Sequence, residues 1–164
     1  MRSKKQNSCG FTILELAVAI AIAAIMAGFA VPSIVNWQHK SRLQGAAVNL
    51  AGDLEMAKMR AIRENSTVVV QFAAENYTIF VDNGAAGGTA GDWVRNGGEA
   101  LVQYRWLPAG VTVILSDLTL ADDRLRFNAK GQPMDVMSPE IIPLQNRVGR
   151  KNVMLTRLGT VRIQ

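Results

Sequence analysis

The feature that most constrains this chain is a long apolar run close to its amino terminus. Residues 11–35 (FTILELAVAIAIAAIMAGFAVPSIV) contain 20 apolar residues out of 25, and Glu15 is their only charge. At about 1.5 Å per residue, residues 16–35 span about 30 Å as a helix, which is close to the thickness of the hydrocarbon core of a bilayer. We therefore predict a membrane-spanning helix over residues 11–35.

The residues on either side of the run indicate its orientation. Residues 1–10 (MRSKKQNSCG) carry three basic side chains and no acidic one. By the positive-inside rule, this flank stays in the cytoplasm and the rest of the chain crosses the membrane. A cleavable secretory signal with a cut in the small residues 27–30 (AGFA) is the other interpretation. The length of the run, the helical pattern beyond it and the intramembrane Glu15 argue against that interpretation.

A basic leader ending in Gly10, followed by Phe11-Thr12-Ile13-Leu14-Glu15 and an Ala/Ile-rich stretch, resembles the signal of type IV prepilins. The resemblance implies that a prepilin peptidase cuts after Gly10 and methylates the new amine of Phe11. It also implies that Glu15 pairs with the Phe11 amine of a neighbouring subunit in a filament, which makes a buried acid tolerable. The implied partners are other pilins, the prepilin peptidase and an inner-membrane assembly platform.

The same resemblance implies a location and a domain organisation. The chain would cross the bacterial inner membrane once, with its amino terminus in the cytoplasm and its carboxyl-terminal part in the periplasm, before it enters a filament. The expected segments are a leader (1–10), a transmembrane and filament-core helix (11–35), an amphipathic half-helix (36–65) and an antiparallel β domain (66–164).

Removal of the leader changes the net charge and the cysteine content of the chain. The full chain has a net charge of +5 and one cysteine, Cys9. Without residues 1–10 the net charge falls to +2 and no cysteine remains. A cysteine-free chain has no disulfide framework and no CxxC metal or redox motif. With His39 as the only histidine, we predict no enzyme activity, no cofactor and no metal-dependent catalysis.

After residue 35 the pattern becomes amphipathic. Apolar residues recur at spacings of three and four, which predicts one buried helical stripe ending near residues 63–66. The stripe consists of Leu43, Ala47, Leu50, Leu54, Ala57 and Ala61. We expect it to pack on the chain's own sheet, with a coiled coil as the alternative. Pro32 is expected to kink or loosen the helix earlier in its course.

From Thr67 onward the sequence is rich in β-forming residues. Short strands with brief connections predict an antiparallel sheet or two small sheets, and a tight hairpin at residues 75–76. The expected strands are 67–72, 77–81, 101–107, 111–115, 125–127, 153–156 and 161–163. The predicted fold class is therefore α+β, with the long amino-terminal helix packed on a carboxyl-terminal antiparallel β domain.

A glycine-rich segment, residues 83–98, separates two of these strands. It contains six glycines but no Gly-Lys-Ser/Thr and no following helix, which argues against a nucleotide site. We predict a flexible hairpin tip. The carboxylates of Asp82, Asp92 and Glu99 leave a calcium site as an alternative.

A second motif narrows the resemblance. The segment 126–133 (RFNAKGQP) resembles the Phe-x-x-x-Gly-x-Pro segment of the GspH/FimT group of minor pilins and pseudopilins, with Phe127, Gly131 and Pro133 matching. The closing Gly159-Thr160-Val161-Arg162-Ile163 is similar to the final strand of that group. In physical terms, we expect a strand that ends in a turn, where Gly131 takes a positive φ and Pro133 stops the pairing.

This resemblance implies a minor pseudopilin of a type II secretion system, a structural subunit that helps to start the pseudopilus and takes part in protein secretion. The alternative is a FimT-like minor pilin of a type IV pilus, with a role in pilus assembly, adhesion or DNA uptake. Some FimT-like pilins bind DNA through an arginine-rich carboxyl-terminal loop, and Arg147, Arg150 and Lys151 occupy the similar place here. Such contacts would be made to phosphates. A solvated turn, or a rim that docks on acidic partner pilins, would explain the same residues.

Overall fold

The computed structural model describes residues 11–134, 136 and 139–164. By its internal contacts the chain divides after residue 38 into two compact units. The longest element, α1, begins at Ile13 and ends at Glu64, and it is helical through Pro32.

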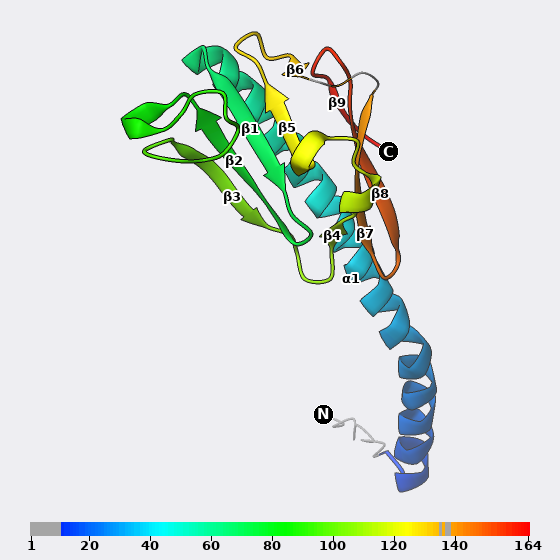
Figure 1. Ribbon diagram of the computed structural model, residues 1–164. Coiled ribbons are helices and arrows are strands. Elements are labelled where there is room, and N and C mark those ends of the chain that lie inside the picture. Colours follow the sequence, from blue (N-terminus) through cyan, green and yellow to red (C-terminus); the bar gives the residue numbers. More distant parts are fainter. Residues whose placement is uncertain (1–10, 135, 137–138) are drawn as a thin grey trace, which may run out of the picture. The chain divides into compact units, whose positions relative to one another are not determined.

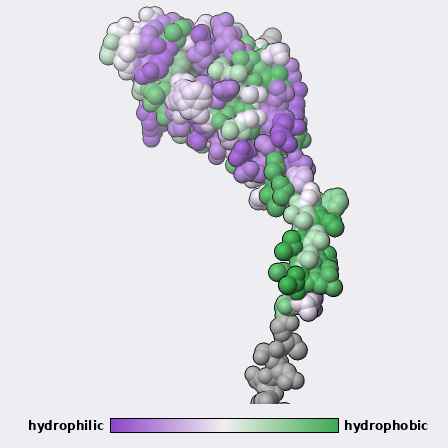
Figure 2. Space-filling model, turned by 90° about the horizontal axis from the view of Figure 1, so that it is seen from below, coloured by the Kyte–Doolittle hydropathy of each residue, from purple (hydrophilic) through white to green (hydrophobic). Residues whose placement is uncertain are grey.

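The first unit contains the early part of α1. Its apolar side chains are exposed, with Phe11 83% exposed, and none of its most apolar stretch is buried. Figure 2 shows hydrophobic side chains gathered on the visible face of this part of the helix. Within the described part of the chain, α1 is the helix long and apolar enough to cross a membrane, by length and composition.

The second unit begins at His39 and contains the end of α1, which lies within the predicted range of residues 63–66. Asn65 follows the helix with a φ of 49°, and the Ser66 amide donates to the Ala61 carbonyl at 3.2 Å. A left-handed residue followed by this bond is the usual way in which a helix satisfies its last carbonyls. The chain therefore turns at once into its first strand.

The strands form two antiparallel sheets, as the short strands and brief connections predicted (Figure 1). The five-stranded sheet has the order β3-β2-β1-β5-β6 and the four-stranded sheet has the order β4-β7-β8-β9. The five-stranded sheet consists of β1 (Thr67–Phe72), β2 (Asn76–Asp82), β3 (Leu101–Trp106), β5 (Arg124–Phe127) and β6 (Pro133–Met134). The four-stranded sheet consists of β4 (Thr112–Val113), β7 (Glu140–Asn146), β8 (Gly149–Leu155) and β9 (Val161–Ile163). Three short 3-10 turns, Ala85–Gly87, Leu115–Asp117 and Ala121–Asp123, lie in the connections.

Most of the predicted strands are confirmed, but β8 begins at Gly149 instead of residue 153, and β6 was not predicted. The strand expected at 111–115 is only two residues long, because the chain enters a 3-10 turn at Leu115. Strand β7 was not predicted, because Pro143 interrupts its apolar sequence. The Pro143 carbonyl accepts a bond from Ile114, so the ring nitrogen faces the side where β4 is short. The missing N–H therefore leaves the pairing with β8 intact.

The predicted helical stripe forms one side of the core. All six of its residues are at most 4% exposed, and they pack against inward side chains of both sheets. Val68, Val70 and Phe72 come from β1, while Ile142 and Leu144 come from β7. The stripe is therefore covered by the chain's own sheets, as expected, and not by a coiled-coil partner. All buried hydrophobic residues of the described chain lie between Leu43 and Leu155.

One buried polar cluster ties α1 to the five-stranded sheet. The Asp53 carboxylate accepts hydrogen bonds from the Tyr77 hydroxyl at 2.6 Å, from Arg105 Nε at 2.6 Å and from Arg105 Nη2 at 3.1 Å. Burial, and then the bond to Asp53, raise the pKa of the Tyr77 phenol far above its usual range. The hydrogen bond to Asp53 raises the pKa of Arg105. The cluster thus holds a neutral phenol and an ion pair between helix and sheet.

We expect Tyr77→Phe to destabilise the soluble fragment 40–164, because Asp53 loses a hydrogen bond that Tyr77 makes without any exposure to solvent. The expected loss is about 1.5–3 kcal/mol, the usual contribution of a hydrogen bond to a charged group. Urea unfolding measures it. The control is Tyr104→Phe, because Tyr104 is the other tyrosine and its side chain is exposed. Equal unfolding midpoints for the two variants would contradict the role of the cluster.

Candidate functional site

The amino-terminal end of α1 is closed by two of its own side chains. Glu15 Oε2 accepts hydrogen bonds from the Thr12 amide at 3.2 Å and from the Thr12 hydroxyl at 3.3 Å. In return, the Glu15 amide donates to Thr12 Oγ1 at 3.2 Å. This reciprocal pattern is a capping box, which satisfies donors that a helix start leaves free. The positive end of the helix dipole also favours the carboxylate at this place.

The Thr-x-x-Glu spacing is the usual sequence signature of a capping box, and it gives Thr12 a role that the prepilin resemblance does not imply. Glu15 was assigned a role between subunits, and the structure adds a role within the chain. Phe11 precedes the box and is exposed. Gly10, the expected cleavage position, and Cys9 lie outside the described residues.

The segment with Phe127, Gly131 and Pro133 is a strand, a turn and a return strand. Phe127 is buried at the end of β5, and Gly131 takes a φ of 74°, as predicted. Asn128 organises the turn, since its Oδ1 accepts the amides of Lys130 and Gln132, both at 2.9 Å. The expectation that Pro133 stops the pairing is wrong, because Pro133 pairs with Phe127 and opens β6. β6 is the edge of its sheet, where a proline is tolerated.

The two carboxyl-terminal motifs meet on α1. A Cβ on Gly131 would lie 2.7 Å from Ile62 Cδ1, and a Cβ on Gly159 would lie 2.8 Å from the Gly131 carbonyl oxygen. Lys58 completes the junction, because its Nζ donates to the Gly159 carbonyl at 2.9 Å. The matching glycines are therefore needed for close packing at the end of the helix, which is a structural role.

The basic residues of the carboxyl-terminal segment lie on the hairpin of β7 and β8. Arg147 is in the exposed turn, as the alternative of a solvated turn between strands predicted. The expectation of one basic loop is wrong for Arg150 and Lys151, because both belong to β8. Arg150 also forms an ion pair with Asp117, at 2.7 Å between Nη2 and Oδ2. The hairpin therefore presents less uncompensated charge than its sequence indicates.

The glycine-rich segment is the connection between β2 and β3, and its acidic side chains hold it together. Asp82 accepts the amides of Gly91 at 2.7 Å and Trp93 at 3.0 Å. Glu99 likewise accepts the amides of Gly84 and Asn96, both at 3.0 Å. The connection is therefore a hairpin tip, as predicted, but it is tied by internal hydrogen bonds.

The described residues give no support to the calcium alternative for this segment. In the described residues no group of three or more acidic, histidine or cysteine side chains could hold a metal ion. Asp82 and Glu99 instead point at backbone amides, and Asp92 accepts the amide of Val94 at 2.9 Å. The segment also covers the sheet, because the Arg126 guanidinium carbon lies 4.1 Å from the centre of the Trp93 ring.

Comparison with known protein families gives two matches. The model of the family described as type II transport protein GspH matches residues 46–159. The model of the prokaryotic N-terminal methylation motif matches residues 5–31. No curated protein sequence matches the chain.

Two solved structures have a similar fold. The crystal structure of the type IV minor pilin FimU from Pseudomonas aeruginosa has a TM-score of 0.56 at 17% identity, over 78% of this chain and 90% of FimU. The minor pseudopilin EpsH from the type 2 secretion system of Vibrio cholerae has a TM-score of 0.55 at 16% identity, over 75% of this chain and 96% of EpsH. At these identities the likeness shows a shared fold.

We expect Gly131→Ala to lower the thermal stability of the fragment 40–164. A side chain at a positive φ costs about 1–2 kcal/mol, and here its Cβ would also crowd Ile62. Gly149→Ala is the matched control, because its φ is not in the left-handed region and no atom lies within 4 Å of its Cβ. Melting curves of both variants make the comparison, and an unchanged melting temperature for Gly131→Ala would refute the packing role.

Proposed function

Since the chain belongs to the family of type II transport protein GspH, we propose that it is a minor pseudopilin of a type II secretion system. Its role is structural, as a subunit of a pilin-like filament. The family match over residues 46–159 is the observation that carries the proposal, because it includes the end of α1 and almost all of both sheets. The fold shared with EpsH supports it.

The amino-terminal segment supplies the assembly function in this proposal. A prepilin peptidase cuts after Gly10 and methylates Phe11, in line with the match to the methylation motif. The exposed apolar surface of residues 11–35 is then held by the inner membrane, and later by neighbouring helices in the filament. Glu15 pairs with the Phe11 amine of a neighbour, at a helix end that already favours a negative charge.

A type IV pilus is the alternative machine, because the likeness to FimU is as good as the likeness to EpsH. A role in DNA uptake would then use the basic hairpin. Since Asp117 compensates the charge of Arg150, DNA binding would rest on Arg147 and Lys151. The family match favours the secretion system over this alternative.

Deletion of the gene tests the choice of machine. We expect loss of exoprotein secretion, with pilus formation and DNA transformation unchanged, because a pseudopilin serves secretion alone. Reintroduction of the intact gene should restore secretion. Normal secretion together with loss of pili or of transformation would replace the proposal by its alternative.

Mass spectrometry of the purified full-length product tests the processing step. We expect a chain that begins at Phe11 and carries one added methyl group, because the peptidase recognises the leader through Gly10. A bulky replacement, Gly10→Val, should leave Met1 in place, whereas Cys9→Ser should be processed normally. A cut near residue 30 would support a secretory signal and contradict the prepilin interpretation.

A further inference from the structure

Strand β3 is an open edge with little protection. Among the described residues it pairs only with β2, and it ends the order of the five-stranded sheet. Natural edge strands are usually blunted by charges, by proline or by a covering segment. The one charged residue of β3, Arg105, is turned inward onto Asp53. Three of its apolar side chains are exposed, namely Leu101 (47%), Tyr104 (45%) and Trp106 (61%).

The backbone of β3 is oriented to receive another strand. The Leu107 amide donates to the Glu75 carbonyl at 2.8 Å, at the end of the pairing with β2. In an antiparallel ladder, successive residues direct their backbone groups to opposite sides. The N–H and C=O groups of Tyr104 and Trp106 are therefore directed away from β2, toward the free edge.

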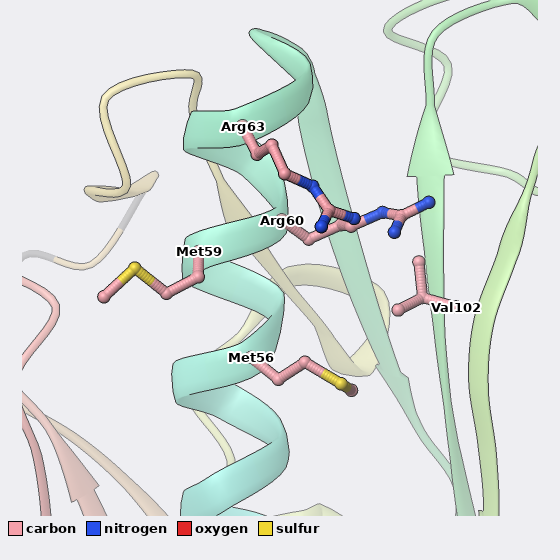
Figure 3. Close-up of a pocket in the computed structure, with 5 residues that line it drawn as sticks. All are labelled: Met56, Met59, Arg60, Arg63 and Val102. Atoms are coloured by element: carbon pink, nitrogen blue, oxygen red, sulfur yellow. The ribbon is translucent and has the colours of Figure 1, made fainter.

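A groove of about 290 Å³ lies beside this edge, between α1 and β3. Its lining consists of Met56, Met59, Arg60 and Arg63 from α1 and Val102 from β3. In Figure 3, Met56, Arg60 and Arg63 extend from the helix toward the strand that carries Val102, whereas Met59 turns to the other side. The lining is thus apolar and basic.

The groove lies where the five-stranded sheet ends at β3, so that no further strand of the described chain covers this part of α1. Asp53, Met56, Arg60 and Arg63 follow at spacings of three, four and three, so they form one ridge along α1. Asp53 is covered by β3 through its bonds to Arg105. A sixth strand beside β3 would continue the sheet over the rest of this ridge.

We propose that an extended segment of another filament subunit adds to β3 as this sixth strand. Alternate residues of a strand face the same side, so one set would face α1. Apolar members of that set would contact Met56 and Val102, and carboxylates would bind at Arg60 and Arg63. Glu64 pairs with Arg60 at 2.5 Å, so Arg63 supplies most of the attraction. The proposal rests on the proposed function, which makes the partner a filament subunit.

A second copy of this chain is a poor occupant of the same edge. Pairing of two β3 strands would bring Arg60 and Arg63 of both copies to one shared groove. Like charges held close together are destabilising. An acidic partner has the opposite effect, which is why the charge of the groove selects a different subunit.

Peptide binding to the full chain in detergent micelles tests the site independently of secretion and processing. The probe is a fluorescent peptide that carries valine, valine and glutamate at alternate positions, and therefore on one face (Thr-Val-Thr-Val-Thr-Glu-Thr). Its binding is read by anisotropy, and the same peptide with lysine for glutamate is its control. We expect saturable binding of the glutamate peptide alone. Arg63→Glu should weaken it about tenfold or more, because a charge-assisted contact becomes a repulsion. Arg147→Glu, an equal change of charge on the distant hairpin, should leave the affinity unchanged.

The backbone contribution is tested by Tyr104→Pro against Tyr104→Thr. Proline removes an amide that faces the free edge, where it is tolerated, while threonine keeps the amide and loses the ring. We expect binding to be lost with proline and retained with threonine. Equal binding by the two variants would overturn the proposal. If the proline variant does not fold, equal binding by Arg63→Glu and the intact chain would overturn it instead.

Analytical sedimentation tests the other possible occupant of the β3 edge, a second copy of this chain. We expect the intact chain in micelles to be monomeric. A dimer that Tyr104→Pro disperses would assign the edge to a second copy and would also overturn the proposal. A failure of peptide binding would leave the expected loss of secretion on gene deletion untouched, so the two conclusions can fail separately.

Discussion

The packing of one narrow helical stripe against two sheets is the constraint on which the rest of the domain depends. The stripe consists of three leucines and three alanines, and its six residues are almost fully enclosed. Alanine lets the backbone of α1 approach the strands closely, while leucine fills the spaces between the inward residues of β1 and β7. A larger residue at an alanine position would push helix and sheet apart, so the width of the stripe sets the spacing of the whole core.

Polar contacts fix the position of the helix along this apolar surface. Asp53 is tied to β2 and β3 through Tyr77 and Arg105, and further along α1 Lys58 is tied to the Gly159 carbonyl. Apolar packing is non-directional, whereas these bonds have fixed geometry. The two contacts therefore define the register of α1 against both sheets. The motif glycines at 131 and 159 belong to the same arrangement. Their role in packing explains why they form a recognisable sequence motif without taking part in a reaction.

The sequence predicted the elements whose signals are local. The apolar run, the helical stripe, the helix end and most strands follow from periodicity and from turn residues within a few positions. Contacts between distant positions could not be predicted in this way. Asp53 and Arg105 are 52 positions apart, and Lys58 and Gly159 are 101 apart. Pro143 disfavours a strand in the local sequence, whereas in the sheet it is tolerated because the neighbouring β4 is short beside it. The carboxylates of the glycine-rich segment resembled ligands for the same reason, since their amide partners become neighbours only in the folded loop.

The confinement of the core to the second unit has a consequence for the proposed transfer of the chain from a membrane to a filament. Every buried hydrophobic residue in the described chain lies between Leu43 and Leu155, and none lies in the first unit. The hydrophobic core of the domain therefore receives no side chain from residues 11–38. Lipid, detergent or the side of another helix can replace one another there without altering the folded domain. Transfer of the chain between these media therefore does not require its globular part to refold.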